Sequence, residues 1–160
     1  MLKCAVYFAI TGLLLFFAGR LIPPHAMQWH RFPYKLHAAE KEGNVYKKIG
    51  IHHWQSKVPD MSKIFPKLMP PKRMVDTGKE SLLRMIQETC VAELTHILLC
   101  VTGLYCIRLW PGTGGMVLAL LNVVLFNLPF ILIQRYNRPR LVRLYKRQIE
   151  KEALEKSCQP

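Results

Sequence analysis

Apolar residues gather in three long runs, and the length of these runs is the first structural signal in the chain. The first run extends from Cys4 to Ile22 and stops at two prolines, the second fills residues 90–109, and the third fills residues 116–134. A helix needs ~20 apolar residues to cross a hydrocarbon core of ~30 Å. The pattern therefore predicts an all-α integral membrane protein with about three transmembrane helices.

The first run has an alternative interpretation as a cleaved signal peptide. Its amino-terminal flank carries only Lys3, and no A-x-A pattern precedes a cleavage point. Its apolar stretch is also longer than the ~7–15 residues that are usual for a signal peptide. These features favour an uncleaved first transmembrane helix over residues 4–22.

The second helix is expected to start before its apolar part. Thr77 and Glu80 form a capping-box pattern, and the apolar residues that follow have helical spacing. We predict one helix over residues 77–110 that contains the second span. Gly114 and Gly115 are then expected to complete a tight turn before the third span at residues 116–134.

Charge is distributed unevenly along the chain, and this determines the expected topology. The 160 residues carry a net charge of +13 although 51% of them are hydrophobic. Residues 20–88 hold 13 basic and 6 acidic side chains, and residues 135–160 hold 8 and 3. Three spans place both basic segments on one side, which the positive-inside rule makes cytoplasmic. We therefore expect a multi-pass membrane protein with both basic segments in the cytoplasm.

Residues 23–76 interleave aromatic and basic side chains. This pattern can indicate stacking on single-stranded nucleic acid. Beside membrane-length runs it favours a segment at the membrane interface, so we expect no nucleic-acid partner. The chain is then a single membrane domain over residues 1–160, with a cytoplasmic interfacial segment at 23–76 and a basic cytoplasmic tail at 135–160.

Glu93 and His96 are the first candidates for chemistry, because they share one face of a membrane-length helix with Thr89. Ionisable groups at such positions are costly and are often functional. One hypothesis is that Glu93 orients His96, which acts as a general base on a hydroxyl. Two alternatives are an interhelical polar clamp with Asn127 or Arg135 and a metal site, although ExxH alone lacks further ligands.

Two further segments are candidates for substrate binding. Residues 134–140, with the sequence Gln-Arg-Tyr-Asn-Arg-Pro-Arg, leave the third span with three guanidinium groups, which suit phosphate. The alternative is an ordinary positive-inside anchor. In the second segment, Lys57 and Asp60 are close enough in sequence to converge on one polar group, with Trp54 as an interfacial anchor. We find no G-x-S-x-G, Walker-type, G-x-G-x-x-G or H-x-x-x-x-D pattern.

The order of these motifs resembles one known family. The pattern comprises Glu40-Lys-Glu-Gly43, Trp54 with Lys57 and Asp60, Glu88-Thr89 with Ala92-Glu93-Leu94 and His96, Asn127 with Pro129, and Gln134 to Leu141. It is similar to the glycosyl-4,4'-diaponeurosporenoate acyltransferase family over residues ~20–145. The chain departs from the family pattern at Gln55, where lysine is expected after tryptophan, and at His52-His53, where basic residues are usual.

The resemblance implies a small membrane enzyme that esterifies a fatty acyl group onto a sugar hydroxyl of a carotenoid glycoside, as in the last step of staphyloxanthin synthesis. We expect an acyl thioester, of coenzyme A or of a carrier protein, as co-substrate, with no cofactor and no metal. The expected catalytic residues are His96 and Glu93. The expected substrate-binding residues are Arg135, Asn137, Arg138, Arg140, Trp54, Lys57, Asp60, Glu88, Thr89, Asn127 and Gln134.

A second class of function stays open at this point. The same arginines would serve a non-catalytic membrane protein that binds a glycolipid and presents it to a partner enzyme. The sequence does not identify the acyl chain, the acceptor lipid or the oligomeric state.

Overall fold

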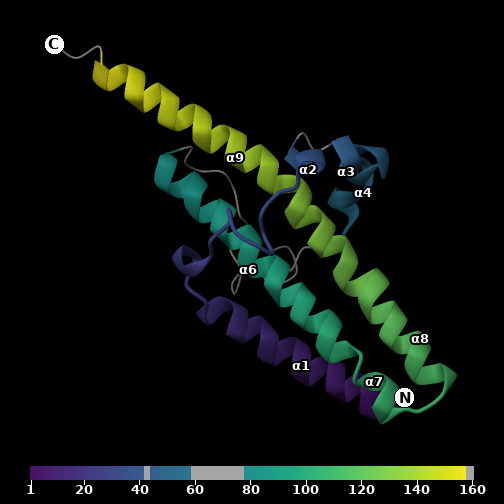
Figure 1. Ribbon diagram of the computed structural model, residues 1–160. Helices are drawn as coiled ribbons and strands as arrows, with labels where there is room; N and C mark the ends of the chain where they lie inside the picture. The colour runs from purple at the N-terminus through teal and green to yellow at the C-terminus, as the bar shows by residue number, and fades with distance from the viewer. Residues whose placement is uncertain (42–43, 59–77, 158–160) are drawn as a thin grey trace.

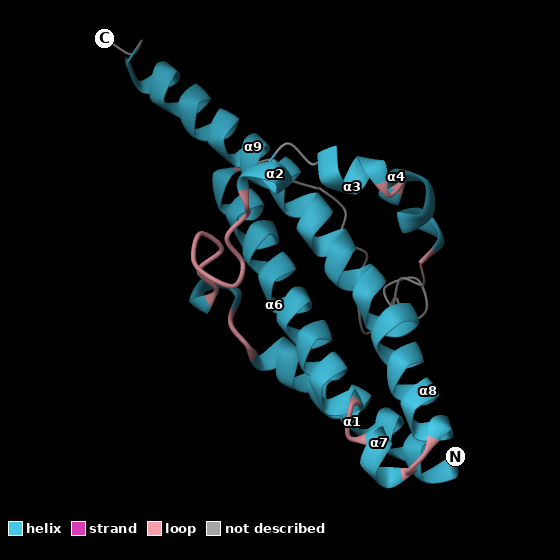
Figure 2. Cartoon of the chain, turned by 45° about the vertical axis from the view of Figure 1, so that its right-hand side comes forward, coloured by secondary structure: helices cyan, strands magenta, loops and turns pink. Residues whose placement is uncertain are grey.

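The computed structural model describes residues 1–41, 44–58 and 78–157. The described residues form helices and loops and contain no strand (Figure 2), which confirms the predicted all-α class. Three helical stretches among them are long and apolar enough to cross a membrane, at Leu2–Leu21, Lys79–Leu109 and Thr113–Ser157. These stretches contain the second and third predicted spans, and all of the first except Ile22.

The second and third stretches are built from several elements. Helix α6 (Lys79–Gly103) is followed after a short break by α7 (Cys106–Leu109). Helix α8 (Thr113–Leu121) continues through a π-helix, η3 (Asn122–Asn127), into α9 (Leu128–Ser157). The predicted helix over residues 77–110 is therefore interrupted near its end. Residue Gly78 is its N-cap, while Thr77 of the predicted capping box lies outside the described residues.

The long helices run side by side in alternating directions (Figure 1). The amino terminus of α1 (Leu2–Leu21) lies near α7 and the start of α8, at one end of the bundle. Helix α6 packs against α9 more extensively than any other pair of described elements does, and α1 packs on α6. The carboxyl-terminal part of α9 extends beyond the bundle. The described parts of the two basic segments thus lie away from the end of the bundle that holds the amino terminus.

The interface between α1 and α6 depends on small residues and shared hydrogen bonds. A Cβ atom on Gly19 would lie 2.7 Å from the Thr95 hydroxyl oxygen, so glycine permits this close approach. The Tyr7 hydroxyl donates a hydrogen bond of 2.9 Å to the carbonyl oxygen of Thr102. Small residues and polar side chains are the usual means of joining helices in lipid. Helix α1 is therefore fixed to the helix that carries the candidate site.

Short helices in the amino-terminal half cover one side of α9. They are α2 (Ala38–Lys41), α3 (Asn44–Lys48), α4 (Ile51–Trp54) and η2 (Gln55–Lys57), whereas η1 (Pro24–Ala26) packs against α6. Tyr46, Ile51 and Tyr136 form a buried cluster, and Trp54 packs against it. This part of the predicted interfacial segment is therefore folded against the third long helix.

The third helix does not end at Gln134 as predicted. Helix α9 continues to Ser157 and includes Pro139, so the segment around Asn137 and Arg138 is helical and is not a turn. Proline within a helix removes one backbone hydrogen bond. Here the turn that precedes the proline is held by arginine side chains that bind other elements, as described below.

Gly115 packs so closely against α7 that any larger residue should clash. Its Cβ atom would lie 2.1 Å from the carbonyl oxygen of Trp110 and 2.9 Å from that of Cys106, and backbone atoms cannot easily move away. We expect Gly115→Ala to destabilise the protein by about 1–3 kcal/mol. Thermal unfolding of the purified chain in detergent would measure this. Gly12→Ala is the control, since no atom lies within 4 Å of its Cβ position. Equal melting temperatures for both variants would contradict this packing.

Candidate functional site

A buried carboxylate joins α6 to α9. One oxygen of Glu93 accepts a hydrogen bond of 2.7 Å from Nε of Arg135, and the other accepts one of 2.5 Å from Nη2 of Arg138. The side chains of Glu93 and Arg138 are 1% and 0% exposed. Both carboxylate oxygens are thus occupied by guanidinium groups of the neighbouring helix.

The remaining nitrogen atoms of the two arginines bind the amino-terminal half of the chain. Arg138 donates to the Thr89 hydroxyl and to the carbonyl oxygen of Tyr34, each at 2.9 Å. Arg135 donates to Glu40 at 2.9 Å and to the carbonyl oxygen of Pro33 at 2.8 Å. These bonds connect four separate segments through two side chains. We call this set the arginine network: Pro33, Tyr34, Glu40, Thr89, Glu93, Arg135 and Arg138.

The arginine network is balanced in charge and in hydrogen bonds. Two carboxylates face two guanidinium groups, and no buried side-chain nitrogen or oxygen of the described residues lacks a partner. A buried ion pair tolerates this environment only when its hydrogen bonds are complete, and it becomes costly when one member is removed. Each nitrogen of Arg138 already has a partner inside the protein, and the side chain is completely buried, so a phosphate from outside does not reach it. The prediction that Arg135 and Arg138 bind donor phosphates disagrees with this geometry.

Glu40 should contribute stability that depends on pH. Burial alone would raise its pKa, but hydrogen bonds from the Tyr46 hydroxyl, the His37 amide and Arg135 outweigh burial and lower the pKa below the ordinary value. Because the folded pKa is the lower one, this stabilisation is present above the unfolded pKa and is lost as the pH falls through the folded pKa. We expect Glu40→Gln to flatten the fall in melting temperature between about pH 5 and pH 3. An unchanged acid limb in the variant would contradict this role.

His96 is bound by an asparagine and not by the carboxylate on its own helix. Its Nδ1 lies 3.0 Å from Oδ1 of Asn127, and its ring is stacked on Phe130 with centroids 4.6 Å apart and planes 7° apart. Glu93 makes its hydrogen bonds to Arg135 and Arg138 instead. The prediction that Glu93 orients His96 therefore disagrees with the geometry. Both contacts that the polar-clamp alternative named are present.

A chain of hydrogen bonds fixes which nitrogen of His96 carries the proton. The carbonyl oxygen of Leu99 can only accept, and it accepts from Nδ2 of Asn122 at 3.0 Å. Nδ2 of Asn127 then donates to the backbone and side-chain oxygens of Asn122 at 2.8 and 3.1 Å. Oδ1 of Asn127 is thus an acceptor, which assigns the proton to Nδ1 of His96 through the network. The lone pair of the neutral ring is on Nε2.

Nε2 of His96 is open to its surroundings. Nε2 has no hydrogen-bond partner among the described residues. Every fully buried side-chain nitrogen of those residues does have a partner. Nε2 is therefore not fully buried and retains accessible surface. A histidine with one nitrogen fixed by an amide and the other free can accept a proton from a hydroxyl that approaches from outside.

The π-helix η3 brings the two asparagines together. Asn122 and Asn127 are five residues apart, which is the hydrogen-bonding period of a π-helix. Gly103 provides room for this turn, since a Cβ atom there would lie 2.0 Å from Nδ2 of Asn122. No role was predicted for Asn122 from the sequence. The only available signal was an amide side chain within an apolar helix.

The other predicted site residues that the structure describes lie on α6, α9, α4 and η2. Gln134 and Asn137 are half-buried and form no side-chain hydrogen bond to a described residue, and Arg140 is exposed with its guanidinium 5.2 Å from the ring of Tyr136. Glu88 forms an ion pair with Arg84 at 3.3 Å. Trp54 donates to the carbonyl oxygen of Ile49 at 3.2 Å, Lys57 is exposed, and Asp60 lies outside the described residues. The structure thus groups Glu93, Thr89, Arg135 and Arg138 around one ion pair, and His96 with Asn127 beside it.

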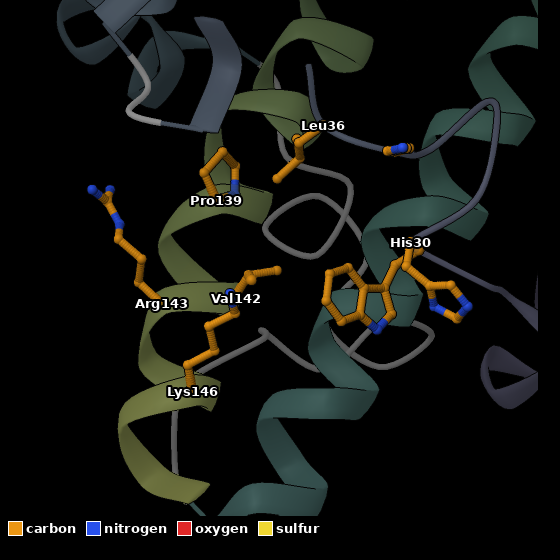
Figure 3. A pocket seen from close by; sticks show the side chains of 8 residues that line it. His30, Leu36, Pro139, Val142, Arg143 and Lys146 are labelled. Carbon is orange, nitrogen blue, oxygen red and sulfur yellow. The ribbon is translucent and has the colours of Figure 1, made fainter. Parts of the chain in front are cut away.

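In the described part of the chain, no group of three or more histidine, cysteine, aspartate or glutamate side chains could hold a metal ion. A cavity with a volume of about 270 Å³ lies between α9 and residues 29–36 (Figure 3). It is lined by neither His96 nor Asn127.

These features define a class of protein: a small helical protein with three membrane-length helices, a buried ion-pair network and, beside it, a histidine bound to an asparagine of the neighbouring helix. The model of the glycosyl-4,4'-diaponeurosporenoate acyltransferase family matches residues 28–147, and the chain belongs to this family. It is accordingly an acyltransferase.

Curated relatives agree with this assignment. A glycosyl-4,4'-diaponeurosporenoate acyltransferase of Staphylococcus aureus strain MRSA252 is 27% identical over 151 residues, which cover 89% of this chain and 86% of the relative. The proteins of the same name from the strains bovine RF122 and N315 are 26% identical with the same coverage. No solved structure matches the chain.

Proposed function

We propose that the protein transfers a fatty acyl group from an acyl thioester to a sugar hydroxyl of a lipid-linked glycoside. The family membership supports acyl transfer. The name of the relatives makes the glycosyl ester of a carotenoid acid the first acceptor to test. The observation that carries the mechanism is the imidazole of His96, with Nδ1 bound to Asn127 and Nε2 open.

In the proposed reaction, Nε2 of His96 accepts the proton of the sugar hydroxyl. The hydroxyl oxygen attacks the thioester carbonyl, so that a carbon–oxygen bond forms and the carbon–sulfur bond breaks. The proton then passes from His96 to the departing thiolate. The amide oxygen of Asn127 holds the ring in orientation, as an asparagine does in some cysteine proteases, and Phe130 restrains its plane.

Roles for the other residues follow from their contacts. Glu93, Arg135 and Arg138 hold α6 against α9 and keep His96 in place, and we no longer assign the two arginines to the donor phosphates. Gln134 lies one helical turn from Phe130, so its amide is the nearest candidate on α9 to stabilise the oxyanion. Asn137 and Arg140 remain candidates for substrate binding, as do Lys57, Trp54 and Asp60 for the acceptor sugar.

An assay with purified protein tests this function. The full chain in lipid nanodiscs receives glycosyl-4,4'-diaponeurosporenoate and either a labelled acyl-coenzyme A or a labelled acyl-carrier protein. We expect a labelled ester of the acceptor with at least one donor. The absence of any ester with both donors, together with tight retention of the acceptor by the protein, would favour a non-catalytic presenter.

The proposed orientation in a bacterial cell membrane has the basic segments in the cytoplasm, because their described parts lie away from the end of the bundle that holds the amino terminus. We expect a cysteine at exposed Ser56 to be labelled only after permeabilisation, and one at exposed Thr113 to be labelled in intact cells. The labelling uses a membrane-impermeant maleimide and a chain whose native cysteines are replaced by alanine. Labelling of the Ser56→Cys variant in intact cells would overturn the orientation.

A further inference from the structure

A cavity that the proposed reaction does not use lies between α9 and the segment that follows η1. Figure 3 shows Arg143, Val142, Lys146 and Pro139 on α9 and, across the cavity, Leu36 and His30. Its volume is about 270 Å³. Its complete lining is Trp29, His30, Lys35, Leu36, Pro139, Val142, Arg143 and Lys146.

The rim of this cavity carries positive charge that no described residue neutralises. Lys35, Arg143 and Lys146 line it together with His30, and no carboxylate is among the lining residues. None of the three cations forms an ion pair with a described residue. This contrasts with the arginine network, where two carboxylates balance two guanidinium groups. The cavity therefore attracts an anion from outside the chain.

The floor of the cavity is apolar. The floor is formed by Trp29, Leu36, Pro139 and Val142. Together with the basic rim it makes the cavity surface amphipathic. The cavity lies on the part of α9 that follows the apolar span, where the chain turns from apolar to basic. Tryptophan, lysine and arginine together are typical of the headgroup level of a membrane. An occupant should thus carry an anionic head next to an apolar body.

We propose that this cavity binds the headgroup phosphate of an anionic glycerophospholipid, with the glycerol and first acyl carbons against the apolar floor. The volume of about 270 Å³ is just below the ~300–1,000 Å³ that is usual for ligand pockets, which suits a glycerophosphate better than a nucleotide coenzyme. Val142 is about 18 Å along α9 from Phe130, which stacks on His96, at 1.5 Å per residue. The lipid site is distinct from the proposed base and does not depend on the proposed reaction.

Lipid binding by the purified full chain in detergent tests this proposal. Native mass spectrometry would measure binding of phosphatidylglycerol, with phosphatidylcholine of the same acyl chains as comparison. We expect a preference for phosphatidylglycerol. The triple variant Lys35→Gln, Arg143→Gln, Lys146→Gln should raise its dissociation constant at least about tenfold, because each cation near a lipid phosphate contributes to binding.

A second triple variant provides a matched control. Arg147→Gln, Lys151→Gln, Lys156→Gln removes the same charge from exposed positions of the same helix without touching the cavity. We expect it to change the dissociation constant less than about twofold. If the first triple variant does not fold, Lys35→Gln alone should still raise the constant about threefold. The proposal would be overturned if both triple variants lost the same affinity for phosphatidylglycerol. It would also be overturned if coenzyme A displaced bound lipid at lower concentrations than added phosphatidylglycerol does.

Discussion

Replacing His96 by alanine is expected to lower turnover by ~10² to 10⁴ per folded molecule, which is the usual contribution of a general base. The reason is that Nε2 is the open, unprotonated nitrogen of a ring whose other nitrogen is fixed by Asn127. Only one hydrogen bond is lost, so the protein should still insert and fold. The rate of ester formation, divided by the folded fraction from size-exclusion chromatography, gives the result.

Exposed His53 is the control for this experiment, since His53→Ala removes an imidazole far along the chain from α6. It should leave turnover unchanged. If His96 only clamps α6 to η3, the His96→Ala protein would be poorly folded, while its surviving folded molecules would turn over normally. Near-wild-type turnover per folded molecule would thus end the assignment of His96 as the base.

Arg138→Ala should have the largest effect on stability, a loss of about 3–5 kcal/mol in the free energy of unfolding. The side chain is completely buried, and its removal leaves one oxygen of Glu93, the Thr89 hydroxyl and the Tyr34 carbonyl without their donor. Chemical denaturation in detergent, followed by tryptophan fluorescence, would measure the loss.

Arg147→Ala is the control, because Arg147 is exposed on the same helix and forms no ion pair with a described residue. It should change stability by less than about 0.5 kcal/mol. If Arg138 instead held donor phosphates, Arg138→Ala would fold normally and raise only the KM for the acyl thioester. That outcome would restore the hypothesis drawn from the sequence.

Sequence reasoning identified the long helices because their signal is local. An apolar run of sufficient length predicts a span whatever the rest of the chain does. The predicted end of the third helix was wrong. Proline usually stops a helix, and basic residues usually mark the end of a membrane span. Here the helix continues, and Arg135 and Arg138 are held in place by residues distant in sequence. Those partners carry no local pattern.

The sequence predicted which residues belong to the site better than it predicted which residues they contact. Glu93 and His96 are three residues apart, and this spacing indicates a shared face but not which neighbouring helix will bind each group. Asn127 was recognised as a polar residue in an apolar run. Its link to Asn122 was not, because an α-helical period of 3.6 residues places positions five apart about 140° from each other. The π-turn removes that separation.

The π-turn at Asn122–Asn127 also lets the two halves of one continuous helix, α8 and α9, be aligned independently against their neighbours. Before it, α8 is aligned by Gly115 against α7, and after it, α9 is aligned by Arg135 and Arg138 against Glu93. An additional residue in the wide turn absorbs the mismatch between these two alignments. Removing a single residue from this turn would rotate the first alignment by about 100° relative to the second. His96 is thus bound, through Asn127, at a junction where a change in chain length would misalign the two halves of the helix.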